Sequence, residues 1–302
     1  MHVFLTGGTG FVGTYILQEL LARGHSVRML VRRSEDRMPG QGKIETVKGD
    51  VTNRKSLNGL MRGCDAVVHL VGIIQEKPAQ GVTFQALHAD ATRHVVDQAR
   101  EDGIERFVHM SANGARPDGV SGYQTSKWEA EEYVRQAGFD RWTIFRPSVV
   151  FGDPGEDNPE FASQLARTLV GPFPILPVFG DGNYEMQPIS VQEVASAFVQ
   201  ALTNDAARQK TYCVAGNDRI PYRKVLDLIA GGMGIAPKPQ IKQPVWLVRP
   251  VVQTVGKLGL LPITPDQFEM LLEGNTCDAS DFYRDFDLTP IRFTAENLGY
   301  LG

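Results

Sequence analysis

The chain has 302 residues, of which 22% are charged and 42% hydrophobic, and its formal net charge is −4 at pH 7. A net negative charge argues against a nucleic-acid-binding protein, and no apolar stretch reaches the length that spans a bilayer. Three cysteines (Cys64, Cys213 and Cys277) are far apart, odd in number and not spaced as metal ligands. We therefore expect a cytoplasmic protein with no metal site, and no targeting peptide before its first strand.

The first 31 residues predict a strand, a glycine turn, a helix and a second strand. Residues 2–6 are a short apolar run, residues 11–21 repeat apolar side chains at helical intervals, and residues 26–31 form the second strand. The turn contains Gly7, Gly10 and Gly13. Such glycines let the backbone approach a pyrophosphate closely, and the helix N-terminus offers unpaired N–H groups to the phosphates. The unit is therefore predicted to bind a dinucleotide.

Two arginines at the end of the second strand indicate which dinucleotide is bound. An NAD site usually has Asp or Glu at this place, whereas an NADP site has Arg. This chain has Arg32 and Arg33, with Glu35 and Asp36 further out. A guanidinium group is a forked, permanently charged partner for a 2′-phosphate. We therefore expect NADP(H) rather than NAD, the alternative being that both arginines are solvated loop charges.

Alternation of strands and helices continues through the first half of the chain. Helices are expected at 53–61, 84–101 and 122–136. Strands are expected at 2–6, 26–31, 44–47, 65–71, 106–110 and 141–145. Strands separated by helical crossovers predict an α/β fold with a Rossmann-type doubly wound parallel sheet.

After residue 151 the regular alternation of predicted strands and helices ends. Residues 152–188 are rich in Gly and Pro, so we expect irregular loops that shape a substrate pocket. Helical patterns return at 191–202 and 222–229, residues 211–214 are strand-like, and Thr264–Gln267 is a capping-box start. The predicted organisation is a nucleotide-binding domain and a smaller C-terminal substrate lobe. Their ranges are 1–150 plus 187–215 for the domain, and 151–186 plus 216–302 for the lobe.

A tyrosine and a lysine in the third helix are the candidate catalytic residues. Tyr123 and Lys127 are four residues apart, which places both on one helical face. Tyrosine has a reference pKa of ~10, and an ammonium group at ~4 Å supplies about the energy needed to lower it by 3 units. Ser111 follows the fifth strand, at the sheet edge where ligands bind, and could orient a substrate carbonyl. The alternative is a surface Tyr and Lys on a solvated helix.

With these residues the chain resembles the short-chain dehydrogenase/reductase superfamily, in its extended or atypical branch, the NAD-dependent epimerase/dehydratase group. The matching stretches are Thr6–Gly13, Gly49–Val51, His69–Gly72, Ser111, Tyr123 with Lys127, and Arg146–Gly152. This resemblance implies that Asp50 and Val51 border the adenine, that Lys127 also holds the nicotinamide ribose, and that Pro147–Val149 pack near the nicotinamide. The implied cofactor-binding residues are Gly7, Thr9, Gly10, Phe11, Val12, Gly13, Arg32, Arg33, Asp50, Val51, Leu70, Val71, Gly72, Lys127, Pro147 and Val149.

Within this family, the chain also resembles the group that contains the NADPH-binding accessory subunit of respiratory complex I and its bacterial relatives. The supporting stretches are Gly180–Ala195 and Ile263–Asn275. One departure is His88, which stands nearest the position where the single-domain branch has an active-site Asn. Another is Ser111, only twelve residues before Tyr123. Both departures argue against a sugar-nucleotide substrate.

Residues 245–261 form an amphipathic pattern with basic residues on the polar face. An ordinary helix packed on the substrate lobe is one interpretation, and a lid or a helix that faces a protein complex or a membrane is the other. For the whole chain we expect an NADP(H)-dependent oxidoreductase, monomeric or dimeric, acting on a small carbonyl, alcohol or sugar-nucleotide-like molecule. The alternative is a non-catalytic NADPH-binding protein with a structural or assembly role related to complex I.

Overall fold

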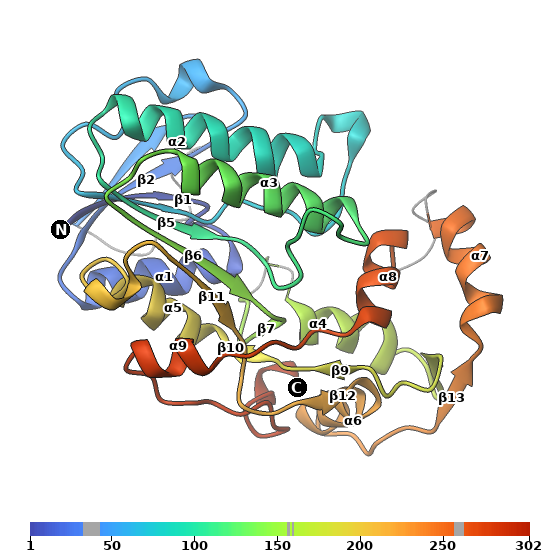
Figure 1. Ribbon diagram of the computed structural model, residues 1–302. Coiled ribbons are helices and arrows are strands. Elements are labelled where there is room, and N and C mark those ends of the chain that lie inside the picture. Colours follow the sequence, from blue (N-terminus) through green and yellow to red (C-terminus); the bar gives the residue numbers. More distant parts are fainter. Residues whose placement is uncertain (33–42, 156–157, 159, 257–262) are drawn as a thin grey trace. The chain divides into compact units, whose positions relative to one another are not determined.

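The computed structural model describes residues 1–32, 43–155, 158, 160–256 and 263–302 (Figure 1). The chain divides into two compact units. Unit 1 comprises Met1–Arg146, Val194–Cys213 and Ser280–Leu288. Unit 2 comprises Pro147–Glu193, Val214–Ala279 and Thr289–Gly302. The polypeptide thus leaves unit 1 and returns to it twice.

A seven-stranded sheet in the order β11-β6-β5-β4-β1-β2-β3 forms the centre of unit 1. Its strands are β1 (His2–Thr6), β2 (Ser26–Val31), β3 (Ile44–Lys48), β4 (Ala66–His69), β5 (Arg106–Met110), β6 (Arg141–Pro147) and β11 (Lys210–Val214). The pairs from β3 through β1 to β6 are all parallel. Their carboxyl ends therefore share one edge, and the strand order reverses between β1 and β4, which is where such sheets bind ligands. The predicted doubly wound parallel sheet is confirmed.

Helices cover both faces of this sheet (Figure 1). On one face lie α2 (Ala91–Glu101) and α3 (Gly122–Gln136), and on the other α1 (Phe11–Ala22) and α5 (Val191–Gln200). Because both faces are covered, all four residues of β4 are buried, as expected of a central parallel strand. The core between the sheet and α2 includes Phe4, Leu57, Val67, Val95, Phe107, Phe139 and Ile144.

Three predicted elements of unit 1 differ in detail. The helix expected at 53–61 is a short 3₁₀ turn, η1 (Arg54–Leu57), and the strand expected at 65–71 is shorter. The helix expected at 84–101 begins as a π-helical turn, η3 (Gln85–Asp90), before α2. Apolar periodicity does not distinguish the π turn from an α turn, because residues of either can face the same core.

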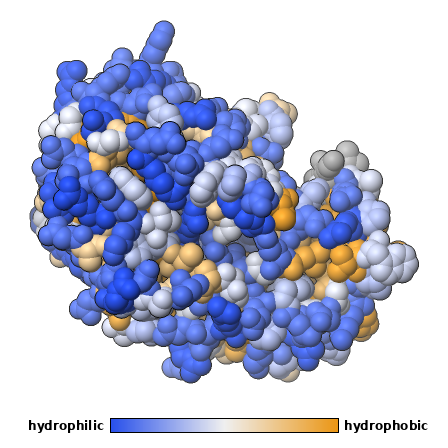
Figure 2. All heavy atoms as spheres, viewed as in Figure 1, coloured by the Kyte–Doolittle hydropathy of each residue, from blue (hydrophilic) through white to orange (hydrophobic). Residues whose placement is uncertain are grey.

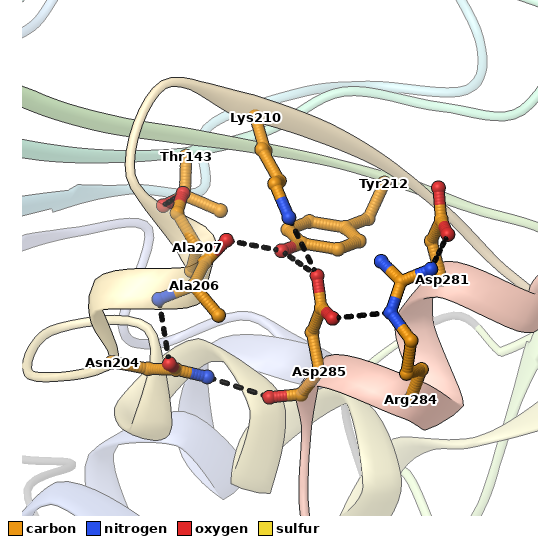
Figure 3. A network of polar contacts seen from close by, with 9 residues as sticks. All are labelled: Thr143, Asn204, Ala206, Ala207, Lys210, Tyr212, Asp281, Arg284 and Asp285. Atoms are coloured by element: carbon orange, nitrogen blue, oxygen red, sulfur yellow. Dashed lines mark hydrogen bonds and ion pairs between the residues drawn. The ribbon is translucent and has the colours of Figure 1, made fainter.

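The last segment of unit 1 is α9 (Ser280–Asp285), which the sequence analysis assigned to the smaller lobe. Phe282 and Phe286 pack on Phe145 of β6, with ring centroids 6.3 Å and 5.5 Å away. Figure 3 shows the polar contacts of Asp285 at the end of α9: its carboxylate accepts hydrogen bonds from the Tyr212 hydroxyl (2.8 Å) and from Lys210 (2.9 Å). Both partners lie on β11. These contacts join residues that are far apart in the sequence, so no local sequence pattern predicts them.

Unit 2 is built from short elements around its own core. Pairs of short strands join β7 (Val150–Phe151) to β10 (Ile189–Ser190), β9 (Glu185–Met186) to β12 (Ile220–Pro221), and β8 (Leu176–Phe179) to β13 (Gln240–Gln243). Its helices are α4 (Phe161–Leu165), π-helical η4 (Ala166–Val170), α6 (Tyr222–Gly232), α7 (Val245–Val255) and α8 (Pro265–Glu273). The Gly/Pro-rich stretch therefore contains only brief regular elements, and the predicted capping box at Thr264 and Gln267 is confirmed. Of the helices in the described ranges, none is both long and apolar enough to cross a bilayer.

Candidate active site

The glycine turn of unit 1 leaves space beside the N-terminus of α1. Gly7 has φ of +76°, a left-handed conformation that favours glycine. A Cβ at Gly13 would collide with the Gly7 carbonyl oxygen and lie 2.8 Å from Gly8 Cα, so only glycine lets the helix start this close to the turn. A Cβ at Gly10 would meet nothing nearer than 3.4 Å. Gly10 is therefore not required by packing, and its open side fits the approach of a phosphate.

The first turn of α1 has the donors that a phosphate needs. Gly10 is the N-cap residue, and no side chain of the described residues caps the helix there. Unpaired N–H groups and the positive end of the helix dipole favour an anion at this place. Phe11 and Gly13 are buried, Val12 is partly buried, and Thr9 is exposed next to the turn. These residues fit the pyrophosphate of a dinucleotide.

Other predicted cofactor residues follow the carboxyl ends of the neighbouring strands. Arg32 is exposed directly after β2, and Asp50 with Val51 follows β3. Leu70, Val71 and Gly72 follow β4, so the described predicted residues of unit 1 gather along one sheet edge. Arg33 lies outside the described residues. Pro147 is the last residue of β6 and Val149 follows the strand; both belong to unit 2.

Lys127 is buried on α3, with 3% of its surface exposed. Its Nζ donates a hydrogen bond to the Met110 carbonyl oxygen at the end of β5 (3.0 Å). A Cβ at position 72 would lie 2.9 Å from this Nζ, so Gly72 leaves room for the ammonium group. Among the described residues no carboxylate forms an ion pair with Lys127, and burial lowers its pKa to about 8. Burying a cation without a paired charge is costly.

Tyr123 lies one helical turn before Lys127, and its ring makes edge-to-face contacts with Phe84 and His88, at centroid distances of 5.7 Å and 5.2 Å. Burial raises the pKa of Tyr123 to about 12. The sequence analysis expected the lysine to lower this pKa, and that expectation is wrong for the net shift, because burial of the phenol raises the pKa. At neutral pH Tyr123 is a phenol that has a proton to donate.

Ser111 belongs to a buried ionic network rather than to the tyrosine. Its hydroxyl donates a 2.5 Å hydrogen bond to the carboxylate of Glu131, which is 0% exposed. The same carboxylate accepts two hydrogen bonds from Arg146 (2.7 and 2.6 Å) and one from Arg135 (2.6 Å). Both guanidinium groups also lie near the Trp128 ring, that of Arg135 at 5.2 Å and that of Arg146 at 5.6 Å from the ring centroid. The network fixes Ser111 and the end of β6.

His88 occupies the π-helical turn beside Tyr123. Ser126 Oγ donates to the Tyr123 carbonyl, so it accepts from His88 Nδ1–H (2.9 Å). The other ring nitrogen then accepts from the Ile73 N–H (3.1 Å). Burial, and secondly the charge of Lys127, lower the pKa of His88 to about 2, so the ring is neutral. His88 therefore links α3 to the loop that carries Gly72.

Two further buried histidines lie on β4 and β5. His69 and His109 are stacked with ring centroids 5.5 Å apart, and His69 Nδ1 is 2.7 Å from Thr6 Oγ1. Burial and the charge of Lys127 lower the pKa of His69 to about 3. Burial also lowers that of His109, neither of whose ring nitrogens has a partner in the described structure. The sequence analysis gave His69 only as part of a matching stretch and missed His109 and Glu131, although Glu131 repeats the four-residue spacing from Tyr123 to Lys127.

The fold and this edge define the class of the protein: a nucleotide-binding α/β protein of the Rossmann type, with a glycine turn before α1 and a Tyr–Lys pair on α3. Residues 3–215 match the NAD dependent epimerase/dehydratase family, and the chain belongs to that family. Members of this family bind NAD(P), as the resemblance of the glycine turn implied.

Relatives in this family include both a respiratory-chain subunit and a reductase. The chain is 32% identical over 238 residues to the NADH dehydrogenase [ubiquinone] 1 alpha subcomplex subunit 9 of Arabidopsis thaliana, covering 74% of this chain and 56% of that protein. It is 31% identical over 198 residues to the ceramide reductase of Caulobacter vibrioides, covering 65% of this chain and 59% of the reductase. The chain thus spans under two thirds of the length of either relative.

A solved structure supports the fold over the whole length. The UDP-glucuronic acid 4-epimerase of Bacillus cereus, in complex with UDP-glucuronic acid and NAD, superposes with a TM-score of 0.75, covering 99% of this chain and 98% of that one. Sequence identity is 17%, so the likeness concerns the fold alone.

Proposed function

We propose that the protein is an NADP(H)-dependent oxidoreductase of the short-chain dehydrogenase/reductase type that acts on a small carbonyl, alcohol or sugar-nucleotide-like molecule. The observation that carries this proposal is Lys127, a buried cation one helical turn after Tyr123 and close to Gly72, whose pKa is lowered by burial although the charge of Glu131 opposes the shift. Perturbed ionisable groups of this kind cluster at functional sites. The likeness to a ceramide reductase supports a carbonyl on a lipid-like molecule as the first substrate class to test.

Each residue has a distinct role in this proposal. Tyr123 donates or accepts the proton at the substrate oxygen, and Lys127 stabilises the phenolate that results and binds the nicotinamide ribose. Ser111, whose own proton goes to Glu131, orients a substrate hydroxyl by accepting its hydrogen bond, and the Glu131 network keeps the serine in place. Gly7, Gly10 and Gly13 admit the pyrophosphate to the N-terminus of α1. The dinucleotide, when bound, supplies or accepts the hydride.

The preference for NADP(H) rests on Arg32, which is exposed at the end of β2, and on Arg33 in the sequence. Calorimetric titration with NADPH and NADH tests it. We expect NADPH to bind more tightly, and the difference to disappear when Arg32→Ala and Arg33→Ala are combined. Equal affinities in the unaltered protein would contradict the preference.

Turnover of aldehydes, ketones and quinones with NADPH tests the enzymatic function. A positioned acid/base group raises the rate by ~10²–10⁴-fold. Tyr123→Phe should therefore lower the turnover rate by that factor while NADPH still binds. Lys127→Ala should weaken both turnover and binding, because the ammonium group serves the phenol and the ribose together. Activity that survives Tyr123→Phe would assign the proton transfer to another group.

A second candidate function is favoured by the 32% identity to the respiratory-chain subunit. In that case the protein binds NADPH as a structural ligand and contributes to the assembly of a complex. Tyr123→Phe would then change little, whereas Gly10→Ala would reduce the thermal stabilisation that NADPH gives. NADPH-dependent stabilisation without turnover of any compound in the panel would favour this candidate.

A further inference from the structure

Unit 2 contains a cavity of about 350 Å³. This volume is at the lower end of the range in which proteins bind small molecules. The walls come from α4, from η4 and the loop after it, from the residue after α6, and from the C-terminal turn η7 (Gly299–Leu301). All described lining residues belong to unit 2, whereas Ser111, Tyr123 and Lys127 belong to unit 1. The described walls of the cavity therefore contain none of the candidate catalytic residues.

The wall formed by η4 and its following loop has a well-fixed backbone. The Gly171 N–H donates to the Ala166 carbonyl oxygen (2.7 Å), which closes the π-helical turn. A Cβ at Gly171 would lie 2.8 Å from that oxygen and 3.5 Å from Met233 Cε, so a larger residue would crowd this wall. Lys238 Nζ donates to the carbonyl oxygens of residues 170, 171 and 173 (2.5, 3.0 and 2.8 Å). Turns of the π type are frequent at functional sites, and the loop after this one is held in place as well.

Arg167 of η4 is the only charged side chain among the described lining residues. It is exposed, and no other described residue forms an ion pair or a hydrogen bond with its guanidinium group. Figure 2 shows hydrophilic residues over most of the visible surface, so an exposed arginine is ordinary by itself. Arg167 differs in its surroundings, because Ala166, Met233 and Leu301 line the same cavity. The cavity thus combines a cation that no described carboxylate neutralises with apolar walls.

The hydroxyl groups at the cavity already have a partner inside the protein. Glu160 is 3% exposed, and its carboxylate accepts hydrogen bonds from the hydroxyls of Ser163 and Tyr300, both of which line the cavity. It also accepts the N–H groups of Ala162 (2.8 Å) and Ser163 (2.7 Å). A hydroxyl has one proton, so neither hydroxyl can donate to a ligand as well. Arg167 is then the one side-chain donor that the described lining offers to a ligand.

We propose that this cavity binds an organic monocarboxylate, with the carboxylate on the Arg167 guanidinium and the apolar body against Met233 and Leu301. Guanidinium and carboxylate groups match as a forked pair with two parallel hydrogen bonds. One cation suits one negative charge, whereas a phosphate group needs more donors than the described lining residues offer. The thioether of Met233 and the ring of Tyr300 favour an aromatic body. The binding does not depend on the proposed function, since neither the dinucleotide nor the substrate takes part.

Calorimetric titration of the full chain with 4-phenylbutyrate tests this proposal. The probe has one carboxylate and an aromatic body, and we expect it to bind saturably. Its alcohol analogue, 4-phenylbutanol, should bind at least roughly tenfold more weakly, because it lacks the charge. Arg167→Gln should lower the affinity for 4-phenylbutyrate roughly tenfold or more for the same reason. Met233→Ala should lower it roughly fivefold or more, because apolar contact is lost. Inorganic phosphate should bind more weakly than 4-phenylbutyrate.

Arg223 provides the matched control for Arg167. It is an exposed arginine of α6 that is not among the lining residues, so Arg223→Gln should leave the binding of 4-phenylbutyrate unchanged. Because Arg167 is exposed, Arg167→Gln should leave the melting temperature unchanged, which separates lost binding from lost folding. The proposal is overturned if 4-phenylbutyrate does not bind, or if Arg167→Gln binds it like the unaltered protein. It is also overturned if the alcohol or phosphate binds equally well, or if the control variant loses as much affinity.

Discussion

Replacement of Glu131 by glutamine tests the buried network that holds Ser111. Glutamine keeps the shape of the side chain but removes its charge, so Arg135 and Arg146 lose the carboxylate that accepts three of their hydrogen bonds. Breaking a buried ion pair from one side costs about 3–5 kcal/mol. The two arginine side chains are 23% and 21% exposed, so water screens part of the loss, and we expect about 3 kcal/mol. At roughly 2–4 °C per kcal/mol, the melting temperature should fall by about 6 °C or more.

Glu132 provides the matched control for this experiment. It pairs with Arg135 at 2.5 Å, but its side chain is 38% exposed, so Glu132→Gln should cost less than about 1 kcal/mol. Thermal unfolding followed by circular dichroism, together with urea unfolding, measures both variants. If Glu131→Gln stays within about 1 kcal/mol of the unaltered protein, or if both variants lose equally, the network does not stabilise unit 1 as argued here.

Three further outcomes are expected. Gly10→Ala should leave the melting temperature unchanged but weaken NADPH binding. Gly13→Ala should lower the melting temperature, because its Cβ would collide with the backbone of the turn. Calorimetry measures the binding and thermal unfolding measures the stability. The buried histidines have pKa values below 6.5, so below pH 6.5 the unfolded chain binds protons that the native chain does not, and stability falls. His88→Asn should make this fall shallower by about 1.4 kcal/mol per pH unit in urea titrations. The native pKa of Lys127, about 8, lies below the ordinary lysine value of 10.5, so stability should rise with pH between these two values; Lys127→Met should lack that rise.

Local patterns predicted the elements of unit 1 well, because each is specified by neighbouring residues. The glycine turn, the apolar β4 and the helix that carries Tyr123 all have signals within a few positions. The same holds for the capping box at Thr264. What the sequence did not reveal depends on contacts between distant residues.

Ser111 illustrates this difference. Its position after β5 was predicted, but its hydrogen-bond partner was not, because Glu131 reaches it only when α3 packs on the sheet. The same holds for the pKa of Tyr123, since the direction of its shift depends on how deeply tertiary packing buries the phenol. In α7, spacing predicted which residues share a face, but only the structure shows that Leu247 and Val251 are exposed.

The return of α9 to unit 1 bears on the order in which the protein can fold during its synthesis. The ribosome releases the chain from its N-terminus, so Phe282 and Phe286 emerge only after every residue between Phe145 and α9 has been made. Until then the ring of Phe145 lacks two of its neighbours, and Asp285 cannot reach β11. The nucleotide-binding unit must therefore wait for the intervening segments of unit 2. A premature stop codon after Ala279 would spare every glycine of the dinucleotide turn and still leave that unit unfinished.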